Sequence, residues 1–178
     1  MTRRTSRLNA SDWLAAGFEA LSDAGPGALK AEPLAVRLKV SKGSFYWHFR
    51  DVPAFHDSLL TAWEADATAR LAHHVGTSEN PVAQLRGLAQ SLTAPPASEP
   101  AIRSWAQGHA PARGSVERID QARLEALQAL LGAAGIRNPE MARILYSATI
   151  GMSQLGSAAP ADREDAIGSM VDLVLALR

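Results

Sequence analysis

The sequence predicts an all-α protein with a small N-terminal three-helix domain and a larger helical body, about nine helices in all. Three observations predict this fold. Apolar residues recur at intervals of three and four, no segment shows the convincing period of two that is typical of strands, and turn or capping residues separate the helical segments. We expect a domain boundary after residue 51, giving domains of residues 1–51 and 52–178.

The first helix is predicted to begin at Asn9 and to end before residues 25–27. Asn9 is a favourable N-cap, Asp12 lies in the first turn, and Leu8 and Trp13 can pack together across the start of the helix. Apolar and small residues then follow at helical spacing until the sequence Gly-Pro-Gly stops the helix.

A second short helix is predicted over about residues 31–38, and a third from Ser41 to near Phe49. Pro33 is tolerated because the first turn of a helix does not use the N–H group that proline lacks. Ser41 can cap the third helix by accepting a hydrogen bond from a backbone N–H two or three residues later. Phe45 and Phe49 lie four residues apart, so they share one face of that helix.

The opposite face of the third helix carries small, polar and wide aromatic side chains. With about 100° of rotation per residue, Gly43, Ser44 and Trp47 point away from the two phenylalanines. Tyr46 and His48 flank this face. A buried helix would place aliphatic residues there, whereas a helix that enters a groove would carry this mixture.

Asparagine, aspartate and proline mark the starts of later helices. Asp51, Asn80 and Asn138 each precede a proline by one or two residues, as is typical of helix starts. A loop is expected at residues 110–114. The six remaining helices are predicted over residues 51–76, 80–94, 99–105, 115–134, 138–155 and 161–178.

Charge is unevenly distributed, although the net charge of the whole chain is zero. Residues 1–50 contain eight Lys/Arg and four Asp/Glu, a net charge of +4, whereas the remainder contains ten and fourteen, a net charge of −4. This asymmetry is typical of a protein whose N-terminal segment binds a polyanion. An ordinary fluctuation of surface charge is the alternative explanation.

Composition excludes several classes of function. The chain contains no Cys, no apolar run of 18 residues and no N-terminal apolar stretch of a signal peptide, so we expect a cytoplasmic protein without a membrane partner. No Gly-rich phosphate loop, nucleophile elbow or carboxylate pair stands out, so we expect no catalytic residues, no cofactor and no enzymatic activity. His73 and His74 point about 100° apart on a helix, and we therefore expect no metal site.

The helix pattern and its motif resemble the TetR family of bacterial transcriptional repressors. The resemblance covers residues 8–63, and its strongest parts are Leu34-Ala35, Val-Ser-Lys-Gly-Ser at residues 40–44 and Phe-Tyr-Trp-His-Phe at residues 45–49. The resemblance implies a homodimer that binds double-stranded DNA at a roughly palindromic operator. Each subunit would contribute one helix-turn-helix, with the two recognition helices about 34–36 Å apart.

The resemblance also implies which side chains meet DNA. Ser44 and Trp47 face outward and are predicted to contact base edges or thymine methyl groups, whereas in the family the positions around them meet phosphates. A basic N-terminal arm would lie on phosphates or in the minor groove, although it could be only a solvated tail. The residues predicted to contact DNA are Arg3, Arg4, Lys42, Gly43, Ser44, Tyr46, Trp47 and His48.

Three positions depart from the family pattern. Lys39 stands where the turn between the second and third helices usually has Gly, and in a left-handed conformation it would cost on the order of 1 kcal/mol. Lys30 replaces the usual Ser or Thr cap of the second helix, which weakens that end by ~1 kcal/mol. Val52 stands where the family often has a phosphate-binding Lys.

The body is predicted to hold a small-molecule effector in a cavity between the fourth to eighth helices. Large aromatic side chains with a few polar groups suit an apolar effector, although each residue alone is explained at least as well by core packing. The candidates are Trp63, Trp105, His109, Leu127 and Tyr146.

Apolar stripes on the last two helices would form the four-helix seam of the dimer, as in the family, or would be buried within one chain. The residues assigned to this seam are Ile144, Ala148, Met152, Ile167, Met170, Val171 and Val174.

Our leading hypothesis is therefore a ligand-responsive repressor in which effector binding pivots the fourth helix and changes the separation of the recognition helices. The alternative is a helical ligand-binding or scaffolding protein that has lost specific operator binding.

Overall fold

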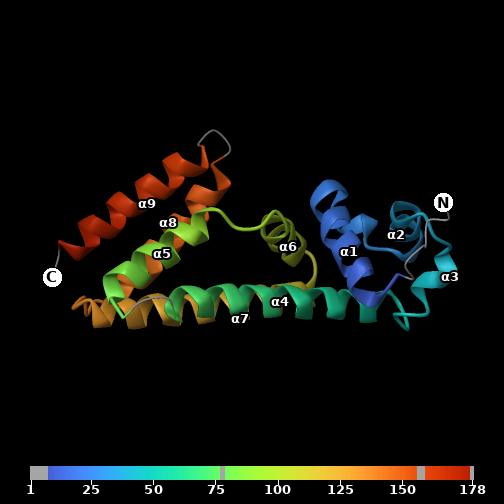
Figure 1. Ribbon diagram of the computed structural model, residues 1–178, viewed down its shortest axis with the longest axis horizontal. Coiled ribbons are helices and arrows are strands. Elements are labelled where there is room, and N and C mark those ends of the chain that lie inside the picture. The colour runs from blue at the N-terminus through green and yellow to red at the C-terminus, as the bar shows by residue number, and fades with distance from the viewer. Residues whose placement is uncertain (1–7, 77–78, 156–158, 177–178) are drawn as a thin grey trace, which may run out of the picture. The chain divides into compact units, whose positions relative to one another are not determined.

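The computed structural model describes residues 8–76, 79–155 and 159–176. Within these residues the chain forms nine α-helices and one short 3-10 helix and contains no strand, which confirms the predicted all-α fold (Figure 1). The elements are α1 (Ala10–Ala24), η1 (Pro26–Ala28), α2 (Ala31–Leu38), α3 (Lys42–Phe45), α4 (Val52–Gly76), α5 (Pro81–Thr93), α6 (Ser98–Ala106), α7 (Ala110–Ala133), α8 (Glu140–Gln154) and α9 (Pro160–Leu175).

Residue contacts divide the chain into two compact units. The first comprises the chain up to Ala65 together with Ala97–Val116, and the second comprises Asp66–Pro96 together with the chain from Glu117 onward. The division between these units falls within α4 and α7. The predicted boundary after residue 51 separates a DNA-binding part from a part that would bind the effector and dimerise. This boundary stays a prediction.

Helix starts follow the capping signals in the sequence. At α1 the Asn9 side chain accepts a hydrogen bond from the Asp12 N–H at 3.0 Å, and the Asp12 carboxylate accepts one from the Asn9 N–H at 2.7 Å. At α4 the Asp51 carboxylate accepts a hydrogen bond from the Ala54 N–H at 2.7 Å. That bond, and a second one from the side chain of Arg50, lower the pKa of Asp51. Both predicted caps are confirmed.

The third helix is shorter than predicted. α3 ends at Phe45, and residues 46–48 continue as turns whose N–H groups donate to the carbonyl three residues earlier, at 3.0–3.3 Å. Ser41 holds the N-cap position, but its hydroxyl makes no capping bond, and its carbonyl accepts from the Ser44 N–H at 2.9 Å instead. The Phe49 N–H still donates to the Phe45 carbonyl at 3.0 Å, which keeps the two phenylalanines on one side.

The loop predicted at residues 110–114 is helical, because α7 begins at Ala110. The imidazole Nδ1 of His109 accepts a hydrogen bond from the Ala112 N–H at 3.3 Å and so caps the helix. Pro111 lies in the first turn, where its missing N–H is not needed. Pro111 and Gly114 therefore do not break the helix here, because the first is in the first turn and the histidine cap stabilises that turn.

The core of the first unit is an aromatic cluster around Phe45. Its ring lies 5.4 Å from Trp13 of α1, 5.3 Å from Phe49 and 5.4 Å from Phe55 of α4, measured between ring centroids. The pairs with Trp13 and Phe55 are edge-to-face, and pairs of this kind contribute about 0.5–1.5 kcal/mol beyond simple burial. α1 approaches α4 closely at Gly17, where an added Cβ would lie 2.7 Å from the Phe55 ring.

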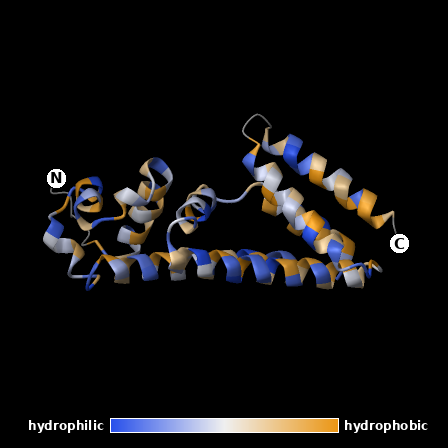
Figure 2. Cartoon of the chain, turned by 180° about the vertical axis from the view of Figure 1, so that it is seen from behind, coloured by the Kyte–Doolittle hydropathy of each residue, from blue (hydrophilic) through white to orange (hydrophobic). Residues whose placement is uncertain are grey.

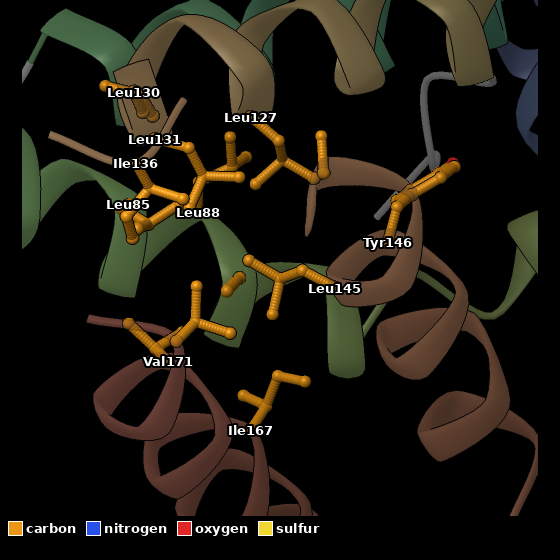
Figure 3. Close-up of a cluster of buried hydrophobic side chains, with 13 residues drawn as sticks. Leu85, Leu88, Leu127, Leu130, Leu131, Ile136, Leu145, Tyr146, Ile167 and Val171 are labelled. Carbon is orange, nitrogen blue, oxygen red and sulfur yellow. The ribbon is translucent and has the colours of Figure 1, made fainter. Parts of the chain in front are cut away.

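The second unit has its own core, built from α5, α8 and α9 with the parts of α4 and α7 that belong to this unit. Leu85 of α5, Leu145 of α8 and Val171 of α9 are fully buried and point toward one another (Figure 3). Hydrophobic and hydrophilic residues are interspersed along α9 (Figure 2), and its buried residues Ile167, Val171 and Val174 recur at intervals of three and four, as a helix with one buried face requires. None of the described helices is both long enough and apolar enough to cross a bilayer.

We predict that Lys39→Gly will raise the free energy of unfolding by about 0.5–1 kcal/mol. Lys39 is left-handed, with φ 56° and ψ 42°. Relief of a strain of about 1–2 kcal/mol exceeds the extra entropy of about 0.5–1 kcal/mol that an unfolded Gly gains. Urea unfolding measures the change, and Lys39→Ala is the control, because it removes the charge but keeps the strain. Equal stabilisation by both variants would contradict the strain argument.

Gly17→Ala is expected to lower the free energy of unfolding by about 1 kcal/mol, because the overlap with the Phe55 ring outweighs the better helix propensity of Ala. Gly87→Ala is the matched control. Its Cβ would lie 3.8 Å from His74, an ordinary contact, so it should stabilise α5 by about 0.5–1 kcal/mol. Thermal unfolding of both variants tests the pair, and stabilisation by Gly17→Ala would show that α1 and α4 can separate without cost.

Candidate nucleic-acid interface

The turn between α2 and α3 fixes the direction of the third helix. The Lys39 N–H donates to the Val36 carbonyl at 3.1 Å, and the Val40 N–H donates to the Ala35 carbonyl at 3.0 Å. With Lys39 left-handed, these two bonds form a Schellman motif, which normally uses glycine at this position. The chain therefore leaves α2 in a defined direction and places α3 beside α1.

The segment after this turn separates a buried side from an exposed side. Phe45 and Phe49 are buried, which confirms that they share a face. Trp47 is 80% exposed and Tyr46 is 50% exposed. Lys42 and Gly43 are also exposed, whereas Ser44 and His48 are half-buried. The side opposite the phenylalanines is thus open, as the sequence predicts.

Two hollows lie on the surface beside this segment. One, of about 1010 Å³, is lined by the start of α1, the turn after α2, and three residues that follow it: Ser44, Trp47 and His48. The other, of about 770 Å³, is lined by the start of α2, by Val52 of α4, and by Lys42 and Tyr46. Residues 42–48 line both hollows, so this segment stands between them.

Lysines line both hollows. Lys39 lines the first, and Lys30 and Lys42 line the second. Lys42 forms an ion pair with Glu32 at 3.9 Å, and both side chains are exposed. Lys30 and Lys39 were not among the residues predicted to contact DNA. The excess of positive charge in the first fifty residues was the signal that could have added them to the candidate contacts.

The predicted DNA contacts from residues 42–48 therefore lie together on one surface. Arg3 and Arg4 of the predicted arm lie outside the described residues. Whether any of these side chains contacts DNA stays a prediction.

Three of the predicted effector residues belong to the first unit. Trp63 is buried, and its indole N–H makes no hydrogen bond to any described residue. The ring of Trp105 stacks on His109, with centroids 4.4 Å apart, and both rings meet His56 edge-on. Burial lowers the pKa of His109, the nearby imidazole of His56 adds to this, and Asp57 opposes it.

His56 was not predicted from the sequence. Its Nε2–H donates to the Leu29 carbonyl at 3.0 Å, so this side chain of α4 is bonded to the segment before α2. A single histidine between Phe55 and Asp57 gives no signal in the sequence of such a contact.

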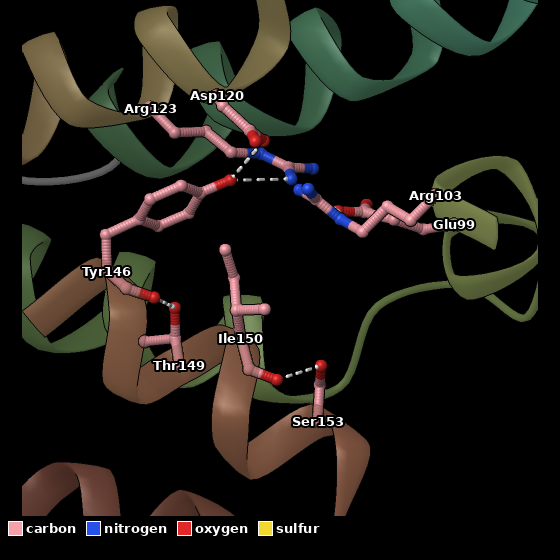
Figure 4. Close-up of polar contacts among 8 residues, drawn as sticks. All are labelled: Glu99, Arg103, Asp120, Arg123, Tyr146, Thr149, Ile150 and Ser153. Atoms are coloured by element: carbon pink, nitrogen blue, oxygen red, sulfur yellow. Dashed lines mark hydrogen bonds and ion pairs between the residues drawn. The ribbon is translucent and has the colours of Figure 1, made fainter. Parts of the chain in front are cut away.

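The other two predicted effector residues belong to the second unit. Leu127 is fully buried in the core. The Tyr146 hydroxyl donates to the Asp120 carboxylate at 2.6 Å and accepts a hydrogen bond from Arg123 at 3.4 Å (Figure 4). Burial disfavours the phenolate and raises the pKa of Tyr146 to about 12, although the positive charge of Arg123 opposes the shift.

The residues predicted for the dimer seam divide into two groups. Ile167, Val171 and Val174 are buried in the core of their own chain, which was the alternative that the sequence left open. Ile144 is 46% exposed. Ala148, Met152 and Met170 are half-buried.

The part of the sequence that forms this surface matches a known family. Residues 14–51 match the family described as "Bacterial regulatory proteins, tetR family". Tetracycline repressor protein class G from Vibrio anguillarum is 39% identical over 57 residues. The match covers 32% of this chain and 27% of that repressor, so the chain spans about a quarter of the length of the curated relative.

Solved structures share the fold over nearly the whole chain. A TetR-family transcriptional regulator from Streptomyces coelicolor superposes with a TM-score of 0.79 at 18% identity, covering 98% of this chain and 91% of that one. A transcriptional regulator from Rhodococcus sp. Rha1 gives a TM-score of 0.77 at 21% identity, covering 95% and 97%. Together these likenesses show that residues 14–51 are similar to the helix-turn-helix segment of the tetR family and that the chain has the fold of TetR-family regulators.

Proposed function

We propose that the protein is a transcriptional repressor that binds a palindromic operator on double-stranded DNA as a homodimer and is released by a small-molecule effector. The observation that carries this proposal is the exposed segment of residues 42–48, which stands between two hollows: Lys39 lines one, and Lys30, Lys42 and Glu32 line the other.

The geometry suits the major groove of DNA. The groove is about 12 Å wide and admits one helix, with a phosphate strand on either side. With residues 42–48 in the groove, each hollow would face one strand. Lys39 would be available to the phosphates of one strand, and Lys30 and Lys42 to those of the other. Such contacts would fix the position of the protein along the DNA without selecting a base sequence.

Exposed apolar side chains on α8, directly after α8, and on α9 support the homodimer. Ile144 and Leu155 are 46% and 52% exposed, and Leu173 is 68% exposed. A second copy of the same two helices would cover these side chains in a four-helix seam. We therefore propose this exposed face as the interface, in place of the side chains that the chain buries in its own core.

Buried aromatic side chains support an apolar effector. A buried N–H without a partner costs about 1–3 kcal/mol, so the indole of Trp63 would favour an effector that carries a carbonyl or ether oxygen. We propose that the effector binds the body and pivots α4, which changes the separation of the two recognition segments. Such an effector needs a different affinity for each of the two states.

The alternative is a helical ligand-binding or scaffolding protein without specific operator binding. Two observations favour it: Lys39 strains the turn before α3, and Val52 offers no cation at the start of α4. A selection of duplexes from a random pool separates the two functions, because only the repressor would enrich a palindrome.

We predict that binding to the selected duplex will be strongly salt-dependent and that Lys42→Ala will reduce this dependence. Each phosphate contact adds about 0.9 to the slope of log K against log salt, so the loss of one contact per subunit should lower the slope of a dimer by about 2. Fluorescence anisotropy at several salt concentrations measures the slope.

Arg137→Ala is the matched control, because it removes the same charge from an exposed loop of the second unit. The control should leave the slope unchanged. An equal loss of slope in both variants would mean that net charge, and not a contact at this surface, governs binding.

Leu173→Glu is expected to convert the protein to monomers and to weaken binding to the palindrome at least tenfold, because a charge would be buried in the proposed seam. Sedimentation equilibrium measures the oligomeric state. Leu173→Met keeps the apolar character and should remain dimeric. A dimeric Leu173→Glu variant would place the interface elsewhere.

A further inference from the structure

A cluster of three rings in the first unit lies outside the proposed DNA contacts. The rings belong to His56 of α4, Trp105 of α6 and His109, which directly precedes α7. Trp105 and His109 stack with their planes 22° apart, and His56 meets both edge-on, with centroids 5.0 and 5.6 Å away. Trp105 is buried, whereas both histidines are half-buried and can exchange protons with water. Two groups that titrate near neutral pH therefore meet inside one unit.

His109 can cap α7 only while its ring is neutral. Its Nδ1 accepts a hydrogen bond from the Ala112 N–H at 3.3 Å, and its carbonyl accepts one from the Arg113 N–H at 3.0 Å, which are the two bonds of an N-cap residue. An imidazolium carries a proton on both nitrogens and accepts no hydrogen bond. Its positive charge would also face the positive end of the α7 dipole. Proton uptake by His109 therefore removes the cap.

The first turn of α7 cannot replace the lost hydrogen bond without moving. Ala112 is 0% exposed, so without the cap its N–H would be a buried donor that has no partner. Water reaches this N–H only when the turn opens. Loss of the cap thus changes the conformation at the start of α7 and not only its hydration.

The groups around His109 favour its neutral form on balance. Burial lowers the pKa of His109 and the imidazole of His56 lowers it further, while Asp57 raises it. The face of the Trp105 ring also attracts a cation, so it acts in the same direction as Asp57. Because the net pKa lies below the ordinary histidine value of about 6.5, the contribution of the cap to stability is fully present above that value and is lost as the pH falls through the lowered pKa.

The other charged groups of the neighbouring helices have partners of their own. In the first turn of α7, the guanidinium of Arg113 donates to the Gln107 carbonyl at 3.3 Å. The charged side chains of α6, and those in the C-terminal half of α1, which packs on α6, are in ion pairs. These pairs are Arg103 with Glu99, and Arg37 with Glu19 and Asp23.

His56 connects this cluster to the helix-turn-helix. Its Nε2–H donates to the carbonyl of Leu29, a buried residue just before α2, at 3.0 Å. The same ring contacts both Trp105 and His109, so a movement of the His109 ring changes the packing of the side chain that holds this segment.

We propose that His56, Trp105 and His109 form a pH-sensitive joint between the start of α7 and the segment before α2. The joint is closed while His109 is neutral and opens when His109 takes up a proton. It goes beyond the proposed function, because it operates whether or not the protein binds DNA. Acid would loosen the unit that carries the recognition segment.

Nuclear magnetic resonance of the full chain, without DNA, tests this joint between about pH 7.5 and about pH 5. Hydrogen exchange of the Ala112 N–H, corrected for the intrinsic effect of pH, reports the cap. The amide nitrogen of Lys30 reports the bond from His56, because it shares a peptide group with the Leu29 carbonyl. We expect the protection of Ala112 to fall about fivefold with a midpoint below about pH 6.5, and the Lys30 resonance to shift with the same midpoint.

His109→Asn keeps a cap that does not titrate, since asparagine is among the best N-cap residues. The protection of Ala112 should then stay constant over this range. His73→Asn is the control, because it removes an exposed imidazole from the second unit and should respond as the wild type does. In the wild type itself, the ring carbons of His109 should titrate with the midpoint of Ala112, a measurement that needs no variant.

Constant protection of Ala112 in the wild type would overturn the proposal. So would a fall that persists in His109→Asn, or a midpoint different from that of the His109 ring, because another group would then sense the proton. A Lys30 resonance that does not follow Ala112 would show that the joint does not reach α2.

Discussion

Burial of the Phe45 ring is the interaction on which the proposed DNA-binding surface depends. The ring contacts Trp13 of α1, Phe49 directly after the exposed segment of residues 42–48, and Phe55 of α4, so it joins α3 and the residues after it to α1 and α4. Because Phe45 and Phe49 face inward, Tyr46 and Trp47 must face outward. The close approach of Gly17 to Phe55 holds α1 and α4 together on the inner side of this cluster. The exposed face is thus a consequence of how the opposite face packs.

α3 itself contributes little to its own stability. A helix of four residues followed by tight turns lies far below the length at which an isolated helix is stable in water. Its conformation is imposed from both ends, by the Schellman motif at Lys39 and by the buried aromatic cluster. A segment held in this way can present exposed aromatic and basic side chains without needing them for folding. The exposed residues of this segment are therefore not constrained by folding, and binding to a partner can determine which residues stand there.

The sequence predicted correctly the features that depend on interactions between residues close together in the chain. The bounds of α1 and α2, the caps at Asn9 and Asp51, and the shared face of Phe45 and Phe49 all depend on residues within one or two turns. The end of α3 and the helical start of α7 were wrong, because tertiary packing and a histidine cap outweighed local propensity. Periodicity showed that α9 has an apolar stripe, but it could not tell whether the chain or a partner covers it. The contacts of His56 join residues far apart in sequence and leave no local pattern.

The three residues that depart from the family pattern, Lys30, Lys39 and Val52, each line one of the two hollows. Lys39 strains the turn, yet it lines the same hollow as Trp47. Lys30 makes no side-chain capping bond to α2, yet it lines the second hollow. Val52, which stands where the family often has a lysine, lines that second hollow as well, so Lys30 supplies there the positive charge that residue 52 does not. A stability cost of about 1 kcal/mol at each lysine is small beside the attraction that several cations gain from a phosphate backbone. Lys30 and Lys39 therefore stand at positions where another residue type would make the fold more stable. Both also line hollows that would face DNA in the proposed complex, so we propose that binding, and not stability, selects these two lysines.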